Sequence, residues 1–216
     1  PMSRKIKIGI TQRVDKVDSY NEYRDALDQK MIDWVVDAGF IPIPIPNTLV
    51  DLDSSDESQP RLGGWLRELD INALLLSGGN DIGNVPQRDL TENYLLAWAE
   101  RNMVPVLGIC RGMQMMGVYA GGKLIEVEGH VKTRHQLQFD DHNREKFVES
   151  VNSYHNQVLE NCPDSFKVLA KSDDGNLEAM VHKYLPWEAW MWHPERETVF
   201  VKNFQERFKD LVHHGK

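Results

Sequence analysis

The segment Val106–Gln114 limits the fold of this chain more than any other stretch does. It reads as a short apolar strand, then Gly-x-Cys-x-Gly, then the start of a helix. Gly108 and Gly112 tolerate a tight strand-to-helix turn, which would leave the Cys110 side chain exposed in strained backbone. The positive end of the helix would favour a thiolate there. A buried structural cysteine followed by a glycine turn fits this motif equally well, so other residues must decide.

Strand-like and helical patterns alternate along the first part of the chain. We expect strands at 5–11, 73–76 and 104–109, and helices at 21–38, 89–101 and 113–120. Alternation of this kind favours a parallel sheet covered by helices. The run Ile41–Pro46 alternates isoleucine with proline, so it can be only an edge strand or an extended segment.

The pattern changes after Lys123. The stretch Glu128–Lys146 is polar and contains His130, His135 and His142. Short strands are expected at 147–150, 166–170, 178–182 and 188–192, and an amphipathic helix at about 198–212.

Size and composition indicate one globular domain spanning residues 1–216. Apolar residues make up 41% and charged residues 27% of the chain, and the net charge is −8. An acidic chain is a poor partner for nucleic acids or membrane surfaces, and no apolar run approaches the roughly 20 residues of a membrane span. We also expect no secretory signal. Two cysteines cannot form a disulfide framework, which favours a reducing cytoplasm, and Cys162 is expected to be inert.

A thiol nucleophile needs a base, and the segment Trp192–Arg196 offers one. Pro194 forces the chain to turn after a strand, so that His193 and Glu195 can converge on one point. A single histidine after a strand is ordinarily just packed or solvated. His-Pro-Glu combined with a cysteine elbow is a much sharper signal.

Three motifs in order resemble the class I glutamine amidotransferase superfamily, and more narrowly its γ-glutamyl hydrolases. They are Gly108-Ile-Cys-Arg-Gly-Met-Gln114, Ser153-Tyr-His-Asn-Gln157 and Trp192-His-Pro-Glu195. The resemblance extends over nearly the whole chain. It implies a single three-layer α/β domain of the flavodoxin-like type, with a mostly parallel central sheet and the nucleophile at the carboxyl end of a strand.

The resemblance also implies roles for individual residues. Cys110 would be the nucleophile, His193 the base and later acid, and Glu195 the carboxylate that orients His193. The other implied positions are the oxyanion donors Gly79 and Arg111, and the glutamate-binding residues Gln114, Tyr154 and His155. Without the resemblance, Gln114 would be read as a solvent-facing helix residue and His155 as a loop side chain.

The chain departs from the family between Gly79 and Arg88, where its connection is short, and at Asn156 and Met191. These departures put the leaving group in doubt. The chain also resembles compact family members of bacterial capsule biosynthesis that hydrolyse γ-glutamyl-CDP-amidate. This resemblance implies γ-glutamyl-CDP-amidate as the favoured substrate, with γ-glutamyl-γ-aminobutyrate as the alternative. The basic candidates for a phosphate-facing rim are Arg88, Lys132, Arg134 and His135.

The cluster from His130 to His135 could equally be a solvated loop. Its spacing would suit a metal, but its basic neighbours repel a cation and no cysteine or carboxylate completes a site. No Walker-type or Gly-x-Gly-x-x-Gly loop occurs. We therefore expect neither a metal nor an organic cofactor.

Hydrolysis of a γ-glutamyl amide through a Cys-His-Glu triad and a thioester is the favoured function. The expected partner is a small γ-glutamyl substrate, and a homodimer is left open. Three rivals remain: a glutaminase subunit that delivers ammonia to a separate synthetase, a noncatalytic sensor module, and a stress-type protein with a reactive elbow cysteine. An intact Cys, His and Glu set speaks against the last two.

Overall fold

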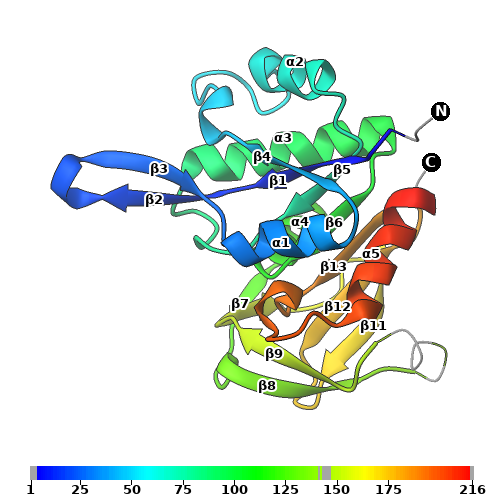
Figure 1. The fold of residues 1–216 in the computed structure, drawn as a ribbon. Coiled ribbons are helices and arrows are strands. Elements are labelled where there is room, and N and C mark those ends of the chain that lie inside the picture. The colour runs from blue at the N-terminus through cyan, green and yellow to red at the C-terminus, as the bar shows by residue number, and fades with distance from the viewer. Residues whose placement is uncertain (1–3, 141, 143–146, 215–216) are drawn as a thin grey trace.

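The computed structural model describes residues 4–140, 142 and 147–214. These residues fold around a central nine-stranded β-sheet (Figure 1). In spatial order its strands are β4 (Ile41–Ile45), β1 (Lys7–Thr11), β5 (Ala73–Leu76), β6 (Val106–Ile109), β13 (Trp187–Trp190), β12 (Leu177–His182), β11 (Phe166–Ser172), β8 (Val131–Gln138) and β9 (Ser150–Tyr154). Pairing is parallel from β4 through β13 and antiparallel from β13 to β9. The expected α/β class is confirmed, and β4 is the proline-rich edge strand.

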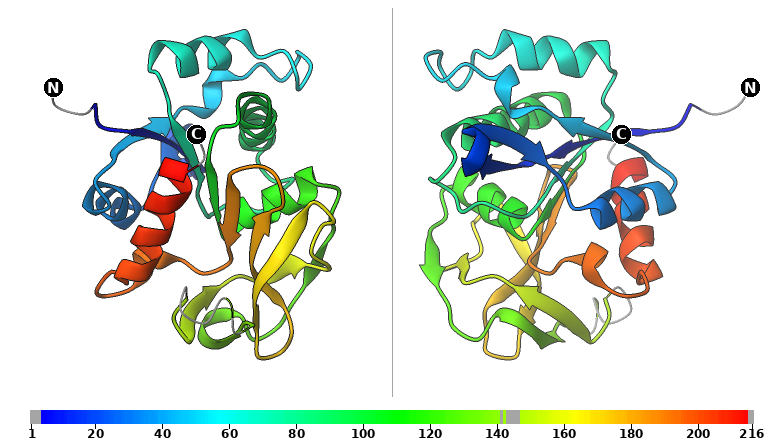
Figure 2. Two further views of the ribbon diagram at one scale, coloured as in Figure 1. Left: turned by 90° about the vertical axis from the view of Figure 1, so that its right-hand side faces the viewer. Right: turned by 60° about the vertical axis from the view of Figure 1, so that its left-hand side comes forward.

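Helices cover both faces of the sheet and complete three layers (Figure 2). Helices α1 (Gln29–Asp37) and α5 (Lys202–His214) lie together on one face, where the rings of Trp34 and Phe208 stack at 5.4 Å. The other face carries α3 (Pro86–Asn102) and α4 (Arg111–Tyr119), and α2 (Pro60–Glu68) lies beyond them. Within the described residues, no helix is long and apolar enough to cross a membrane.

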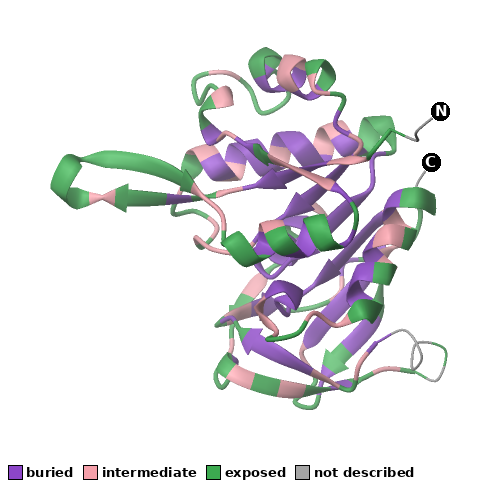
Figure 3. Cartoon of the chain, in the orientation of Figure 1, coloured by how far each residue is buried: buried purple, intermediate pink, exposed green. Residues whose placement is uncertain are grey.

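The buried residues gather on the central strands and on the helix faces that meet them (Figure 3). Strands β5 and β6 are buried along their whole length, as their continuous apolar runs predicted. The carboxyl ends of these two strands therefore lie side by side at one edge of a rigid core, and the loops that follow them are fixed relative to each other.

The expected helix over 21–38 is wrong in its first half. Strands β2 (Arg13–Val17) and β3 (Glu22–Ala26) form a hairpin that projects from the domain, with Asn21 at φ 46° in its turn (Figure 1). Tyr23 matched the helical spacing but is 63% exposed. The helix starts only after Asp28, whose side chain accepts a hydrogen bond from the backbone N–H of Lys30.

The polar stretch 128–146 is also not a loop throughout. Strand β8 occupies part of it and pairs with both β11 and β9, while residues 141 and 143–146 lie outside the described residues. Most of β8 is exposed, so it has no buried apolar alternation that would have revealed it. A small separate sheet joins β7 (Leu124–Glu126) to β10 (Gln157–Leu159).

Candidate active site

Cys110 stands at the sharp turn between β6 and α4, with φ 53° and ψ −104°. Few side-chain-bearing residues adopt this conformation, which costs roughly 1–3 kcal/mol and has to be held by its surroundings. The backbone N–H of Cys110 donates to the carbonyl of Trp190 at 2.8 Å, which ties the turn to β13. The cysteine therefore occupies the elbow that its sequence motif predicted, in front of the N-terminus of α4.

The elbow can form only because Gly112 has no side chain. A Cβ atom at Gly112 would lie 2.2 Å from the carbonyl oxygen of Leu76, the last residue of the neighbouring strand β5. Backbone atoms cannot move aside as a flexible side chain can, so the turn packs directly on β5. This close approach brings Cys110 beside the loop that follows β5.

His193 and Glu195 lie at the carboxyl end of β13, in the turn that begins at Pro194. Nδ1 of His193 is 2.7 Å from Oε1 of Glu195, and both side chains are buried. This hydrogen bond leaves Nε2 of the imidazole for the cysteine side of the site. The structure thus brings together the three residues expected to form the triad.

Charges around His193 favour its protonated form. Burial by itself lowers the pKa of His193, but the Cys110 sulfur and the Glu195 carboxylate outweigh burial and raise that pKa to about 9. An imidazolium is the form of histidine that can donate a proton to a leaving group. His193 is therefore protonated at neutral pH and can act as a general acid.

Asn152 holds the backbone of His193 and was not anticipated from the sequence. Its Oδ1 accepts from the His193 N–H at 2.9 Å, and its Nδ2 donates to the His193 carbonyl at 2.8 Å. Asn152 lies on β9, at the far edge of the sheet from β4, so the antiparallel strands position the histidine. Asn152 lies in the middle of a strand 41 residues before His193, and no local pattern marks it.

The loop Ser77–Gly79, which follows β5, carries the first expected oxyanion donor. Arg88 is fully buried beneath this loop. Its guanidinium donates to the carbonyls of Ser77 at 2.7 Å and Gly78 at 3.1 Å, and also to that of Gly79. With three successive carbonyls fixed in this way, the orientation of the loop is set.

The position of Arg88 differs from the phosphate-facing one expected from the sequence. The side chain has no exposed surface, and burial lowers its pKa to about 9. It cannot reach a leaving group in solvent, so Arg88 is a positioning residue for the loop. The second expected oxyanion donor, Arg111, begins α4 directly after the elbow, and its side chain pairs with Asp89 at 2.5 Å and with Glu92.

Of the three residues expected to hold the glutamate end, Gln114 and Tyr154 lie near the elbow and His193, whereas the side chain of His155 does not. Gln114 is buried in α4, not solvent-facing, and its Nε2 donates to the carbonyl of Gln157 at 2.9 Å. The ring of Tyr154 lies edge-on to that of His193 at 5.8 Å, and the Arg196 guanidinium lies 4.5 Å from the Tyr154 ring centre. The side chain of His155 faces the opposite way and is buried beside His130 and Glu178.

The other basic candidates from the sequence are engaged elsewhere. Arg134 pairs with Glu197 at 3.0 Å and remains half exposed, and Lys132 is exposed. The side chain of His135 is only 10% exposed and lies against His130. None of the three has a contact with the elbow among the described residues.

Arg13 is the basic residue that the sequence reasoning missed. It begins the unexpected hairpin, and its guanidinium lies 3.2–3.3 Å from the point that a Cβ on Gly79 would occupy. With Arg196 and His193 it lines a pocket beside the loop Ser77–Gly79. The only hint in the sequence is its place two residues after the strand end at Thr11.

Comparison with known proteins agrees with this geometry. The family model of peptidase C26 matches residues 7–195. The chain is 35% identical over 200 residues to the γ-glutamyl-CDP-amidate hydrolase of Campylobacter jejuni, covering 88% of this chain and 90% of that protein. It is 26% identical to the γ-glutamyl-γ-aminobutyrate hydrolase of Escherichia coli O157:H7, covering 78% of each.

The fold has a solved counterpart as well. The crystal structure of a glutamine amidotransferase from Thermotoga maritima superposes with a TM-score of 0.64 at 15% identity, over 98% of this chain and 85% of that one. The expected amidotransferase-like architecture is thereby confirmed. From the family match over most of its length, the chain belongs to the peptidase C26 family.

Proposed function

We propose that this chain is a γ-glutamyl amide hydrolase that uses Cys110, His193 and Glu195, and that its leaving group carries nucleotide phosphates. The observation that carries the proposal is the meeting of the strained Cys110 with the buried His193–Glu195 pair. Membership of the peptidase C26 family and the likeness to two γ-glutamyl hydrolases support the reaction type.

The site residues suffice for a two-step hydrolysis. The Cys110 sulfur attacks the γ-carbonyl carbon, and the backbone N–H groups of Gly79 and Arg111 receive the resulting oxyanion. His193 gives its proton to the leaving nitrogen as the C–N bond breaks, which leaves a γ-glutamyl thioester on the sulfur. His193 then takes a proton from water, whose oxygen attacks the thioester and releases glutamate and the thiol.

Glu195 keeps the imidazole in one orientation throughout. Because its carboxylate accepts from Nδ1, the proton that moves is always the one on Nε2. Gly78 lies against the His193 ring and leaves it no room to tilt toward the loop. Both contacts position the base without touching the reacting atoms.

The leaving group is assigned from the charges around the loop. Arg13 lies over Gly79, and Arg196 lies next to Tyr154, so two cations line the pocket beside His193. Both side chains are partly exposed. Nε of Arg13 pairs with Asp15 at 3.1 Å, and the other guanidinium nitrogens of Arg13 would be the ones to bind a phosphate, together with Arg196. A nucleotide amidate supplies that phosphate, whereas glutamine and γ-glutamyl-γ-aminobutyrate do not.

A panel of substrates tests both parts of the proposal. Glutamate release is measured for γ-glutamyl-CDP-amidate, γ-glutamyl-γ-aminobutyrate and glutamine with the wild type at low and high salt. We expect kcat/KM to be highest for the amidate, and its advantage to fall as salt screens the arginines. Trapping of a γ-glutamyl adduct on Cys110 by mass spectrometry reports the thioester.

Variants separate the hydrolase from its specificity. Arg13→Gln should lower kcat/KM for the amidate about tenfold more than for glutamine, since a charge-assisted hydrogen bond contributes roughly 1.5–3 kcal/mol. Arg24→Gln, on the exposed side of the same hairpin, is the matched control. Arg134→Ala tests the rim expected from the sequence. Glutamine as the best substrate would favour the glutaminase alternative, and no release from any substrate would refute the hydrolase.

A further inference from the structure

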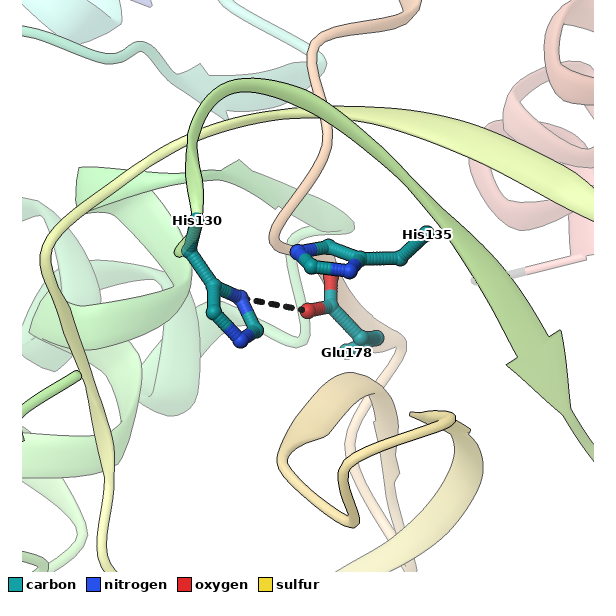
Figure 4. A group of neighbouring side chains, drawn as sticks. All are labelled: His130, His135 and Glu178. Carbon is teal, nitrogen blue, oxygen red and sulfur yellow. Dashed lines mark ion pairs between the residues drawn. The ribbon is translucent and has the colours of Figure 1, made fainter. Parts of the chain in front are cut away.

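Three histidines and a glutamate converge inside the antiparallel part of the sheet, away from the elbow. His130 precedes β8, His155 follows β9, and Glu178 lies on β12. His135 comes from β8 itself, and each of His130, His135 and Glu178 brings a ligand atom within 4.8 Å of the others. Figure 4 shows the imidazole rings of His130 and His135 beside the Glu178 carboxylate.

The distances in this cluster match the edges of a metal coordination shell. Nδ1 of His130 lies 3.3 Å from Nε2 of His155, and Oε1 of Glu178 lies 3.6 Å and 3.5 Å from these two nitrogens. A tetrahedral zinc site with bonds near 2.1 Å has ligands about 3.4 Å apart. The three atoms thus form a nearly equilateral triangle of the right size.

His130 Nδ1 and His155 Nε2 lie at hydrogen-bond distance from each other, but the other proposed ligand atoms of the cluster have no hydrogen-bond partner among the described residues. The two distances to Glu178 exceed the usual N–H···O range of about 2.7–3.2 Å. Among the described residues, neither oxygen of Glu178 has a hydrogen-bond partner, nor does Nε2 of His135, and all three atoms are buried. The Glu178 carboxylate is thus ion-paired with two histidines but accepts no hydrogen bond, and a cation between these atoms would give its buried oxygens a close partner.

The surroundings supply the outer contact that such a site requires. Nε2 of His130 lies 2.6 Å from Oδ2 of Asp174, so Nδ1 is the nitrogen that faces the cluster. A carboxylate behind a histidine is the common outer partner of a zinc ligand. Ser172 donates to the same Asp174, which holds this carboxylate in place.

The two objections raised by the sequence do not hold in the fold. Glu178 completes the site from a strand more than 40 residues away in sequence. The basic neighbours Lys132 and Arg134 are exposed, and Arg134 is neutralised by Glu197. Two carboxylates, Glu178 and Asp174, balance the charge of one divalent ion.

We propose that this cluster is a structural Zn²⁺ site. His130, His135 and Glu178 already lie within 4.8 Å of one another, and His155 Nε2, which is 3.3 Å from His130 Nδ1, would be the fourth ligand after a small adjustment. Three imidazoles and one carboxylate are a donor set that zinc accepts, and four protein ligands leave no open position for chemistry. The ion would fasten the segment before β8 and the end of β9 to β12.

Such an ion would act on the candidate active site through His155. This residue follows Tyr154, whose ring contacts His193, and precedes the turn to Gln157, whose carbonyl binds Gln114. A metal bond to His155 would hold that turn in one conformation. His130, His135 and Glu178 would then be positioning residues, remote from the reacting atoms.

Metal content and thermal stability test the site directly. Purified chain is stripped with a chelator, reconstituted with Zn²⁺, and analysed by elemental mass spectrometry after removal of free metal. We expect close to one zinc per wild-type chain, and a Tm raised by about 5 °C or more at zinc concentrations far above Kd. Glu178→Gln keeps the shape but loses the charge. Loss of a hydrogen-bond partner behind a metal ligand lowers metal affinity roughly 10- to 100-fold. Glu178→Gln changes a ligand itself, so it should lower the affinity for zinc by more than that.

Control measurements separate a loss of zinc binding from poor folding of a variant. His214→Gln removes an exposed histidine at the end of α5 and should leave zinc content and the Tm shift unchanged. His135→Gln is the second ligand variant, and wild-type chain loaded with Co²⁺ should show the visible bands of four-coordinate cobalt. Wild-type chain that takes up no zinc, or zinc content equal in wild type, Glu178→Gln and His135→Gln, would overturn the proposal.

Discussion

A Cβ atom on Gly78 would lie 2.6 Å from Cε1 of His193, so the absence of a side chain at residue 78 defines where the imidazole sits. The ring cannot retreat, because its Nδ1 is bonded to Glu195 and its backbone is held on both sides by Asn152. The loop Ser77–Gly79, which carries the expected oxyanion donor Gly79, therefore also packs against the imidazole of the expected base His193.

Gly78→Ala should consequently disable the site without unfolding the chain. The added methyl group displaces the imidazole from the line toward Cys110, and we expect kcat to fall about 100-fold or more, since misplacement by about 1 Å can cost that much. Gly64→Ala is the control, because a Cβ there meets only the end of the Arg67 side chain at 3.8 Å. Steady-state kinetics and circular dichroism together check the prediction, and unchanged kcat would contradict it.

Cys110→Ala should abolish turnover and leave the fold and substrate binding largely intact. The side chain points into the site, and its removal deletes the atom that attacks the carbonyl. Cys162→Ala is the matched control. That thiol is half-buried with its pKa raised by burial, and no contact with a histidine is found for it in the described part of the chain, so its loss should be nearly silent. Wild-type turnover by Cys110→Ala would show that the nucleophile is misassigned.

His193 should titrate far above an ordinary histidine. Its pKa is raised from 6.5 to about 9, so its protonated form stabilises the fold fully below about pH 6.5, and this contribution disappears as pH rises through about 9. NMR of labelled histidine should give a midpoint near 9 in the wild type. The midpoint should be lower in Cys110→Ala, because the Cys110 sulfur makes the largest raising contribution. A wild-type midpoint near 6.5 would contradict the described electrostatics.

Glu195→Gln should cost less activity than His193→Ala. An orienting carboxylate is one step removed from the proton transfers, and a glutamine oxygen can still accept from Nδ1. Single-turnover acylation rates with one substrate compare the two variants. Equal or reversed losses would count against the assigned roles.

The parts of the fold that were predicted from sequence are those with local signals. The elbow at Cys110 and the His-Pro-Glu turn each lie within a few residues, and the apolar runs of β5 and β6 are fully buried. The β2–β3 hairpin was missed because its strands are mostly exposed, so the spacing of Tyr23 imitated a helix.

Contacts between distant segments account for what sequence reasoning could not find in the site. Asn152 reaches His193 from another strand, and Glu178 joins His130 from across the sheet. The sequence predicts a phosphate-facing position for Arg88 because this residue ends the short connection that begins at Gly79. Only the fold shows that three buried carbonyls surround it.

The role of Arg88 leads to the final prediction, that Arg88→Lys lowers kcat much more than it raises KM. A lysine keeps the charge but lacks the planar fork that binds the carbonyls of Ser77, Gly78 and Gly79 together. The loop would then lose its fixed orientation, and the Gly79 N–H would meet the oxyanion less well. Removal of one oxyanion donor costs about 100- to 1000-fold in kcat, which sets the upper limit of the effect. Arg67→Lys, on the exposed side of α2, is the control. Steady-state kinetics with a γ-glutamyl amide that carries no phosphate separate this role from leaving-group binding. If Arg88→Lys changed KM alone, and only for a phosphate-bearing substrate, the rim expected from the sequence would be right and the role in holding the loop would be wrong.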